Sequence, residues 1–154
     1  MRREHDRPLW TCPKCGARLV TRDMSHSCGA HSVEAFLEGK SPAEVALFRT
    51  FEAMVAKCGP YLVAPAKTRI AFMARTRFAS VNSLGPTGMR FHIGLPRIAK
   101  TKRAVRIEEL GPWKIHHFKV SASEELDAEI QDLLHESYHQ MGLQGRLKRR
   151  PPQA

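Results

Sequence analysis

The stretch "KTRIAFMARTRFASV", residues 67–81, decides the fold class of this chain. In its first part apolar residues fill the even positions from 70 to 74, and the arginines all fall at odd positions. The apolar set is Ile70, Phe72 and Ala74, and the basic set is Arg69, Arg75 and Arg77. An alternation of period two is typical of a β-strand with one packed face and one open face. The stretch therefore predicts a strand whose apolar side chains meet a core and whose arginines point away from it.

Four more strand-like runs lie around this stretch. They are "YLVAP" at 61–65, "MRFHIGL" at 89–95, "RAVRIEEL" at 103–110 and "WKIHHFKV" at 113–120. Their composition, rich in β-branched and aromatic residues, favours strands. The same alternation directs Val105 and Ile107 inward and Arg106 outward. We therefore expect about five sequential strands in one sheet.

Two amphipathic segments flank the strands. The first, residues 41–60, opens with Ser41 as the N-cap, Pro42 at the first helical position and Glu44 completing a capping box. The second, at about 121–142, opens with another S-x-x-E capping box. A helix, about five strands and a final helix predict an α+β fold, a two-layer sandwich with a mostly antiparallel sheet and both helices on one face.

The chain of 154 residues divides into four parts by composition. We expect a flexible N-terminus at 1–8, a zinc-binding element at 9–40, the αβ sandwich at 41–142 and a basic, disordered tail at 143–154. The charged N-terminal residues lack the apolar core of a signal peptide, and no apolar run is long enough to span a membrane. We therefore expect a cytoplasmic protein that contacts no membrane.

Three of the four cysteines lie close to two histidines in one short N-terminal segment. Cys12 and Cys15 form a C-x2-C pair, and Cys28 follows in "HSC". Zn²⁺ favours such a mixed set of thiolates and imidazoles. We expect the fourth ligand to be His26, with His31 as the alternative. Four protein ligands leave no open position for a substrate, so this zinc-ribbon-like or knuckle element would hold one structural zinc ion per chain.

Basic residues are concentrated in the middle of the chain, whose formal net charge is +10. The stretch 53–107 contains 11 Lys and Arg residues and no Asp or Glu. On the open face of the sheet we expect five arginines, with Trp113 as an aromatic ring at the margin. These arginines are Arg69, Arg75, Arg77, Arg90 and Arg106. A flexible basic rim beside them would consist of Lys100, Lys102 and Arg103.

A cationic sheet face with an aromatic ring suits a polyanion, because each phosphate that it neutralises releases counterions. We therefore expect a small zinc-containing protein that binds nucleic acid, DNA or RNA, through this face. Two other classes stay open. One is an interaction module that docks an acidic protein. The other is an enzyme acting on an anionic small molecule, in which His92, His116 or His117 would transfer protons.

The string "HESYH" at 135–139 matches the H-E-x-x-H pattern of zinc proteases. Helical spacing places Ile130 and Leu134 on an apolar stripe that should face the core. His135 and His139 fall opposite that stripe, where a helix faces solvent. We therefore expect this string to have no catalytic role.

Taken together, "LWTCPKCGARLV…HSC", "KTRIAFMARTRFASV" and "SEELDAEIQDLL" resemble an uncharacterised bacterial family of domains of unknown function. The resemblance extends over residues 9 to 142. The order of helices and strands is similar to that of the frataxin-like αβ sandwiches. The resemblance therefore implies the two-layer fold and the zinc motif, and it implies no activity.

Overall fold

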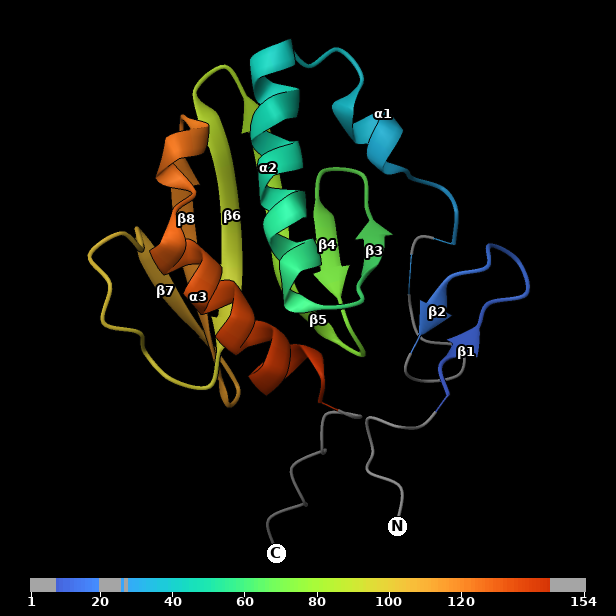
Figure 1. Cartoon of the computed structure of the whole chain (residues 1–154). Coiled ribbons are helices and arrows are strands. Elements are labelled where there is room, and N and C mark those ends of the chain that lie inside the picture. Colours follow the sequence, from blue (N-terminus) through green and yellow to red (C-terminus); the bar gives the residue numbers. More distant parts are fainter. Residues whose placement is uncertain (1–7, 20–25, 27, 145–154) are drawn as a thin grey trace, which may run out of the picture.

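The computed structural model describes residues 8–19, 26 and 28–144 (Figure 1). Its main element is a six-stranded antiparallel sheet in the order β3-β4-β5-β6-β8-β7. The strands are β3 (Leu62–Pro65), β4 (Ile70–Met73), β5 (Arg77–Gly85), β6 (Gly88–Leu95), β7 (Arg106–Leu110) and β8 (Trp113–Val120). A separate hairpin consists of β1 (Trp10–Thr11) and β2 (Arg18–Leu19). The mixed α+β class and the antiparallel sheet agree with the sequence prediction, with six strands in place of about five.

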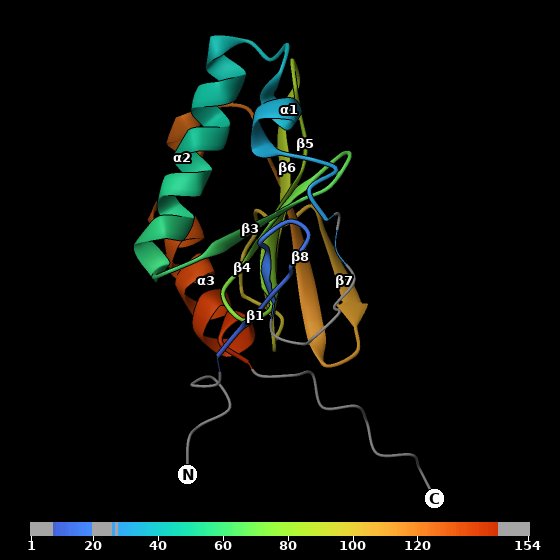
Figure 2. The ribbon, with the colours of Figure 1, turned by 90° about the vertical axis from the view of Figure 1, so that its right-hand side faces the viewer.

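Helices cover one face of the six-stranded sheet. The helical elements are α1 (Val33–Leu37), α2 (Pro42–Cys58), the 3-10 turn η2 (Ser123–Glu125), α3 (Ala128–Ser137) and the π-helical turn η3 (Tyr138–Gly142). Figure 2 shows α2 and α3 on the same side of the sheet, which we call the helix face; the other side is the open face. Within the described ranges no helix is both long and apolar enough to cross a membrane.

The helix α2 begins where its sequence predicts. The hydroxyl of Ser41 accepts from the Glu44 N–H at 3.2 Å, and the Glu44 carboxylate accepts from the Ser41 N–H at 3.3 Å. On the buried side of the helix, Phe51 packs against Phe72 of β4 and Phe91 of β6, with ring centroids 5.7 and 4.7 Å apart. All three rings are fully buried, so this aromatic cluster joins the helix to the centre of the sheet.

The stretch that decides the fold class forms two strands rather than one. A turn at 74–76 separates β4 from β5, which accounts for the sixth strand. The backbone N–H groups of Arg75 and Thr76 donate to the carbonyl oxygen of Gly142, at 2.8 and 3.0 Å. The end of η3 therefore holds this turn in place. Arg75 is only 8% exposed, so the prediction that it points into solvent from an open strand is wrong.

The last helix begins later than its sequence predicts. The N-cap of α3 is Asp127, whose carboxylate accepts from the Ile130 N–H at 3.3 Å. The N–H of Ser121 instead donates to the Glu125 side chain at 3.1 Å, so the predicted cap at Ser121 is wrong. The predicted end at Gly142 is confirmed, because η3 continues the helical path to that residue.

The connection between β6 and β7, residues 96–105, is fastened to the acidic last helix. Three side-chain pairs do this: Arg97–Glu136, Thr101–Glu129 and Arg103–Asp127. From the same loop, the Ala99 N–H donates to the buried His116 side chain at 3.0 Å. The predicted flexible rim of Lys100, Lys102 and Arg103 is therefore wrong for Arg103, whose guanidinium is held beside α3.

The edge strand β7 is exposed along its whole length. Val105 and Ile107 are 65% and 36% exposed, so the prediction that they point into a core is wrong. The reason is that α2 and α3 pack over β5 and β6, in the middle of the sheet (Figure 1).

Candidate metal centre and cationic sheet face

Four side chains of the ligand type meet in the N-terminal element. One ligand atom from each of Cys12, Cys15, His26 and Cys28 lies within 4.8 Å of all the others. The sulfur atoms of Cys12 and Cys28 are 3.8 Å apart, and Cys15 Sγ lies 3.3 Å from His26 Nε2. Two thiolates on a tetrahedral zinc ion would be about 3.8 Å apart, given zinc–sulfur bonds of about 2.3 Å. The cluster can therefore hold a metal ion, and its donors and spacing are compatible with zinc.

Tight turns position the cysteines in this cluster. The Cys12 N–H donates to the Ala17 carbonyl and the Gly16 N–H to the Cys12 carbonyl, both at 2.8 Å. Gly16 and Gly29 have φ values of +76° and +80°, a region that glycine adopts without strain. Each of these glycines directly follows a cysteine of the cluster. Each half of the cluster therefore has a glycine in the left-handed region, and in the second half Cys28 itself also has a positive φ, +52°.

The backbone also favours the thiolate form that a metal requires. The N–H of Cys15, and next that of Lys14, lower the pKa of Cys12 to about 6, because they donate to its sulfur. The pKa of Cys28 is raised to about 11, chiefly because its thiol is hydrogen-bonded to the Cys12 sulfur. The alternative ligand His31 does not belong to the four-residue cluster.

A pocket of about 700 Å³ separates the metal-binding element from the sheet. One wall comes from residues 15–19 and from the segment after Cys28, and the other from β3, the β3–β4 turn and part of β4. Among the residues that the structure describes, no acidic one lines the pocket, whereas four Lys and Arg residues do: Arg18, Lys67, Arg69 and Arg77. Burial, and next the charge of Arg69, lower the pKa of Arg77. The pocket is thus a site of positive charge next to the metal centre.

One row of side chains crosses the open face from the pocket to the far edge. The strand register aligns one residue from each strand: Ala64, Ala71, Ser80, His92, His117 and Arg106. The two alanines also line the pocket. At about 4.8 Å per strand, the row is about 24 Å long. We call the four pocket cations together with His92, His117 and Arg106 the basic path.

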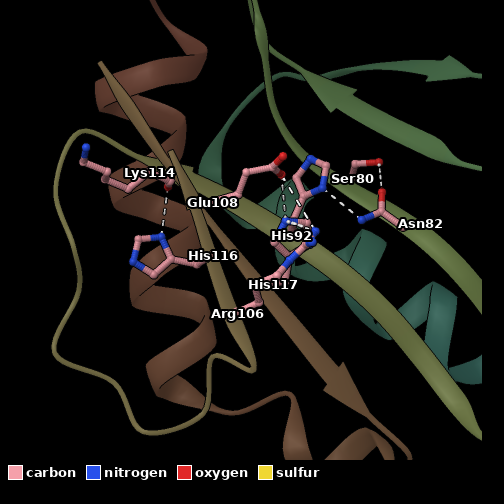
Figure 3. Close-up of polar contacts among 8 residues, drawn as sticks. All are labelled: Ser80, Asn82, His92, Arg106, Glu108, Lys114, His116 and His117. Carbon is pink, nitrogen blue, oxygen red and sulfur yellow. Dashed lines mark hydrogen bonds and ion pairs between the residues drawn. The ribbon is translucent and has the colours of Figure 1, made fainter. Parts of the chain in front are cut away.

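The side chain of His92 is fixed by a chain of hydrogen bonds (Figure 3). Ser80 donates to Asn82 Oδ1 at 3.0 Å, and Asn82 Nδ2 lies 2.9 Å from His92 Nδ1. A β-bulge between Val81 and Ser83 inserts Asn82 at this place. Because the amide donates to Nδ1, the neutral imidazole carries its proton on Nε2. Burial first, then His117 and Arg69, lower the pKa of His92 to about 4, so at neutral pH this ring is an uncharged donor.

We expect the stability of the protein to fall as the pH drops from about 6.5 to about 4, in part because of His92. The unfolded chain binds a proton there at higher pH than the folded chain does, so protonation favours unfolding. The contribution of His92 is at most about 3 kcal/mol. Urea unfolding measured across this pH range should show a shallower decline for His92→Gln than for the unmodified protein. An equal decline of the free energy of unfolding with pH in the two proteins would contradict the assigned pKa.

At the far end of the row, His117 has two competing partners (Figure 3). Its Nε2 lies 3.2 Å from a Glu108 carboxylate oxygen and 3.2 Å from the Arg106 guanidinium. A single ring nitrogen can donate to the carboxylate or accept from the guanidinium, but it cannot do both. Glu108 is also the only acidic residue on the open face of β3 to β8, so it partly compensates the charge at this end of the path.

The predicted open-face cations divide into three groups. Arg69 and Arg77 line the pocket, and Arg106 lies beside His117. Arg90 is exposed opposite Lys119, away from the row. The expected aromatic ring at the margin is only 9% exposed, so Trp113 offers no surface for stacking and that prediction is wrong. The predicted cations that stay on the open face therefore lie at both sides of it, two beside the pocket and two on β6 and β7.

The string at 135–139 has a structural explanation. Glu136 binds the guanidinium of Arg97 through both carboxylate oxygens, at 2.6 and 2.9 Å, and so helps to fasten the β6–β7 loop. In the part of the chain that the structure describes, the N-terminal cluster is the one group of three or more Cys, His, Asp or Glu residues close enough to share a metal. His135 and His139 belong to no such group.

Four residues of the site escaped the sequence reasoning. Arg18 and Lys67 join the pocket through the packing of the N-terminal element on the sheet, which no local pattern signals. Glu108 pairs with His117 across two strands. Asn82 had a signal, because asparagine is disfavoured inside strands and marks an irregularity there.

The fold and the site define a two-layer α+β domain that carries a four-residue Cys/His cluster at its N-terminal side. Residues 33–141 match DUF5655, a domain of unknown function, and the chain belongs to this family. The match begins after the metal-binding cluster, so the family segment is the α/β part alone and not the whole of residues 9 to 142. No curated protein and no solved structure matches the chain.

Proposed function

We propose that this protein binds a polyanion, single-stranded nucleic acid, along the basic path, next to a structural zinc centre. The observation that carries the proposal is the pocket of about 700 Å³, whose described lining contains four Lys or Arg residues and no Asp or Glu. Phosphate groups are the ligands that such a site favours, because each contact releases condensed counterions. The row of His92, His117 and Arg106 continues the site in one direction across the strands.

The chemistry of the path supports recognition of the backbone of a nucleic acid rather than of its bases. Arginine and lysine side chains in the pocket offer charged donors to phosphate oxygens. His92 would add an uncharged Nε2–H donor, since its Nδ1 is engaged by Asn82. The buried Trp113 removes the stacking surface that base recognition uses. Binding should therefore be strongly salt-dependent and largely indifferent to sequence.

Zinc fits the role of a structural ion in this proposal. Three thiolates and one imidazole would complete a tetrahedron around it, with no position left for a substrate. The ion would hold Cys15, Cys28 and their neighbours in place as one wall of the pocket. Its function would be to shape the binding site rather than to act on the ligand.

The test is to replace Arg69 and Arg77 together by glutamate and to measure the binding of short fluorescein-labelled oligo(dT) and oligo(U) by anisotropy. We expect affinity to fall by about tenfold for each arginine, corresponding to about 1.4 kcal/mol each. The slope of log K against log salt should become shallower by about 0.7 for each lost phosphate contact.

Lys57→Glu provides the matched control. Lys57 is exposed in the last turn of α2, which covers the helix face of the sheet. Replacing this lysine by glutamate changes the net charge by the same amount as replacing one arginine by glutamate. It should leave binding nearly unchanged. A second control removes the tail from Gln144 onward, since all of its basic residues lie outside the described part of the chain. Binding that depends on the tail and ignores Arg69 and Arg77 would refute the site. Binding of an acidic protein that survives salt would instead favour a protein-docking module.

A further inference from the structure

The large exposed apolar side chains of the described residues lie in β7 or in the loop before it. The large ones are Ile98, Val105, Ile107 and Leu110, with exposed fractions of 57%, 65%, 36% and 60%. Three of them belong to β7 or directly precede it, and the fourth lies in the loop that leads to it. A monomeric soluble protein scatters such residues, whereas a cluster of them marks an interaction surface.

The two edges of the sheet differ in how they are protected. At one edge, β3 ends at Pro65, which lacks a donor, and the metal-binding element lies across the pocket from it. At the other edge, β7 pairs with β8 alone among the described strands. No backbone hydrogen bond joins β7 to any other described segment. The outer side of β7 is therefore available to another strand.

The residues of β7 favour pairing with the β7 strand of a second copy of the protein. In an antiparallel pair about a two-fold axis, the residue on the axis faces its own equivalent. An axis at Arg106 would oppose two arginines, and an axis at Glu108 would oppose two glutamates, which is unfavourable. An axis at Ile107 opposes two isoleucines and places Arg106 of each copy opposite Glu108 of the other. Only this register, among the three, is complementary in charge.

We propose that the protein forms a two-fold symmetric dimer in which the β7 strands of two copies pair antiparallel about Ile107. The two sheets would then join into one continuous sheet with twelve strands, twice the six of one chain. Ile107 would meet its equivalent, and Val105 would lie opposite Glu109 of the second copy. Arg106 and Glu108, which lie 3.9 Å apart within one chain, would each gain a partner from the second copy. This dimer does not depend on the proposed binding of nucleic acid.

The experiment is sedimentation equilibrium of the full-length, zinc-loaded chain over a range of concentrations up to millimolar. The unmodified protein should show twice the mass of one chain, and Ile107→Lys should show a single chain at the same concentrations. Circular dichroism and zinc content should be unchanged in this variant, because Ile107 lies at an exposed edge. A protein that stays monomeric throughout, or a dimer that Ile107→Lys leaves intact, overturns the proposal.

Charge exchange tests the register itself. Arg106→Glu alone and Glu108→Arg alone should each be monomeric, since each creates like-charge pairs across the axis. An equimolar mixture of these two variants should form a heterodimer, because both glutamates of the first variant would then face arginines of the second. The double variant Arg106→Glu/Glu108→Arg should dimerise again. Dimers in both single variants, or monomers in the mixture and the double variant, would refute the pairing about Ile107.

Discussion

Replacing Cys12 with serine is expected to remove the metal ion and to unfold the N-terminal element, while the αβ sandwich stays folded. In the described part of the element, the strands have two residues each and the buried apolar side chains are Cys12 and Leu19, so this part offers little core to hold it without the ion. Structural zinc contributes about 10 to 16 kcal/mol to the folding of comparable small elements. Metal analysis and amide NMR spectra would report the loss of zinc and the local unfolding together.

The fourth cysteine of the chain provides the matched control. Cys58 is buried in α2, and burial raises its pKa to about 11, which makes it an inert core thiol outside the cluster. Cys58→Ala should therefore keep one zinc ion per chain. His31→Ala should keep it as well, and His26→Ala should lose it. Stoichiometric zinc in a Cys12→Ser/Cys15→Ser double variant would contradict the assignment of the cluster.

Truncating Phe51 to alanine should destabilise the sandwich by about 3 to 5 kcal/mol. The ring is fully buried and contacts the rings of Phe72 and Phe91, at centroid distances of 5.7 and 4.7 Å. Its loss removes apolar contacts from the centre of the core and leaves a cavity between α2 and the sheet. Urea unfolding, followed by the circular dichroism of the sandwich, measures the change in the free energy of unfolding.

A second aromatic truncation calibrates this result. Phe36 of α1 is only partly buried and packs against Phe48 from the edge of the core, at a centroid distance of 5.8 Å. Phe36→Ala should therefore cost clearly less than Phe51→Ala. Equal losses for the two variants, or a loss below about 1 kcal/mol for Phe51→Ala, would show that the aromatic cluster is not the centre of the core.

The sequence was sufficient where short-range chemistry decides the structure. Ser41 and Glu44 form their capping box within one turn of α2, so the start of this helix follows from four adjacent residues. The candidate ligands Cys12, Cys15, His26 and Cys28 come together as their spacing predicts. The alternation along "MRFHIGL" likewise puts Met89, Phe91 and Ile93 on one face of β6, and all three are fully buried.

The sequence was insufficient where contacts with a distant segment determine the local structure. The turn at 74–76 interrupts an alternation that continues through it, and the turn is held by the carbonyl of Gly142, which lies at the other end of the domain. The burial of Arg75 follows from that contact, and no neighbour in the sequence signals it. The same holds for the pocket, since Arg18 and Arg69 meet only because the N-terminal element packs on the β3–β4 side of the sheet.

The shared walls of the pocket have a thermodynamic consequence. One wall belongs to the element that we expect to need a metal ion to fold, and the other belongs to the family domain, residues 33–141. A ligand that touches both walls binds only the state in which the first wall is ordered. The binding of metal and the binding of ligand are then linked through one folding equilibrium. Such linkage is reciprocal: the ion raises the affinity for the ligand by the same factor by which the ligand raises the affinity for the ion. The concentration of free zinc would thus set the affinity of the pocket for its ligand, although the ion would not contact that ligand.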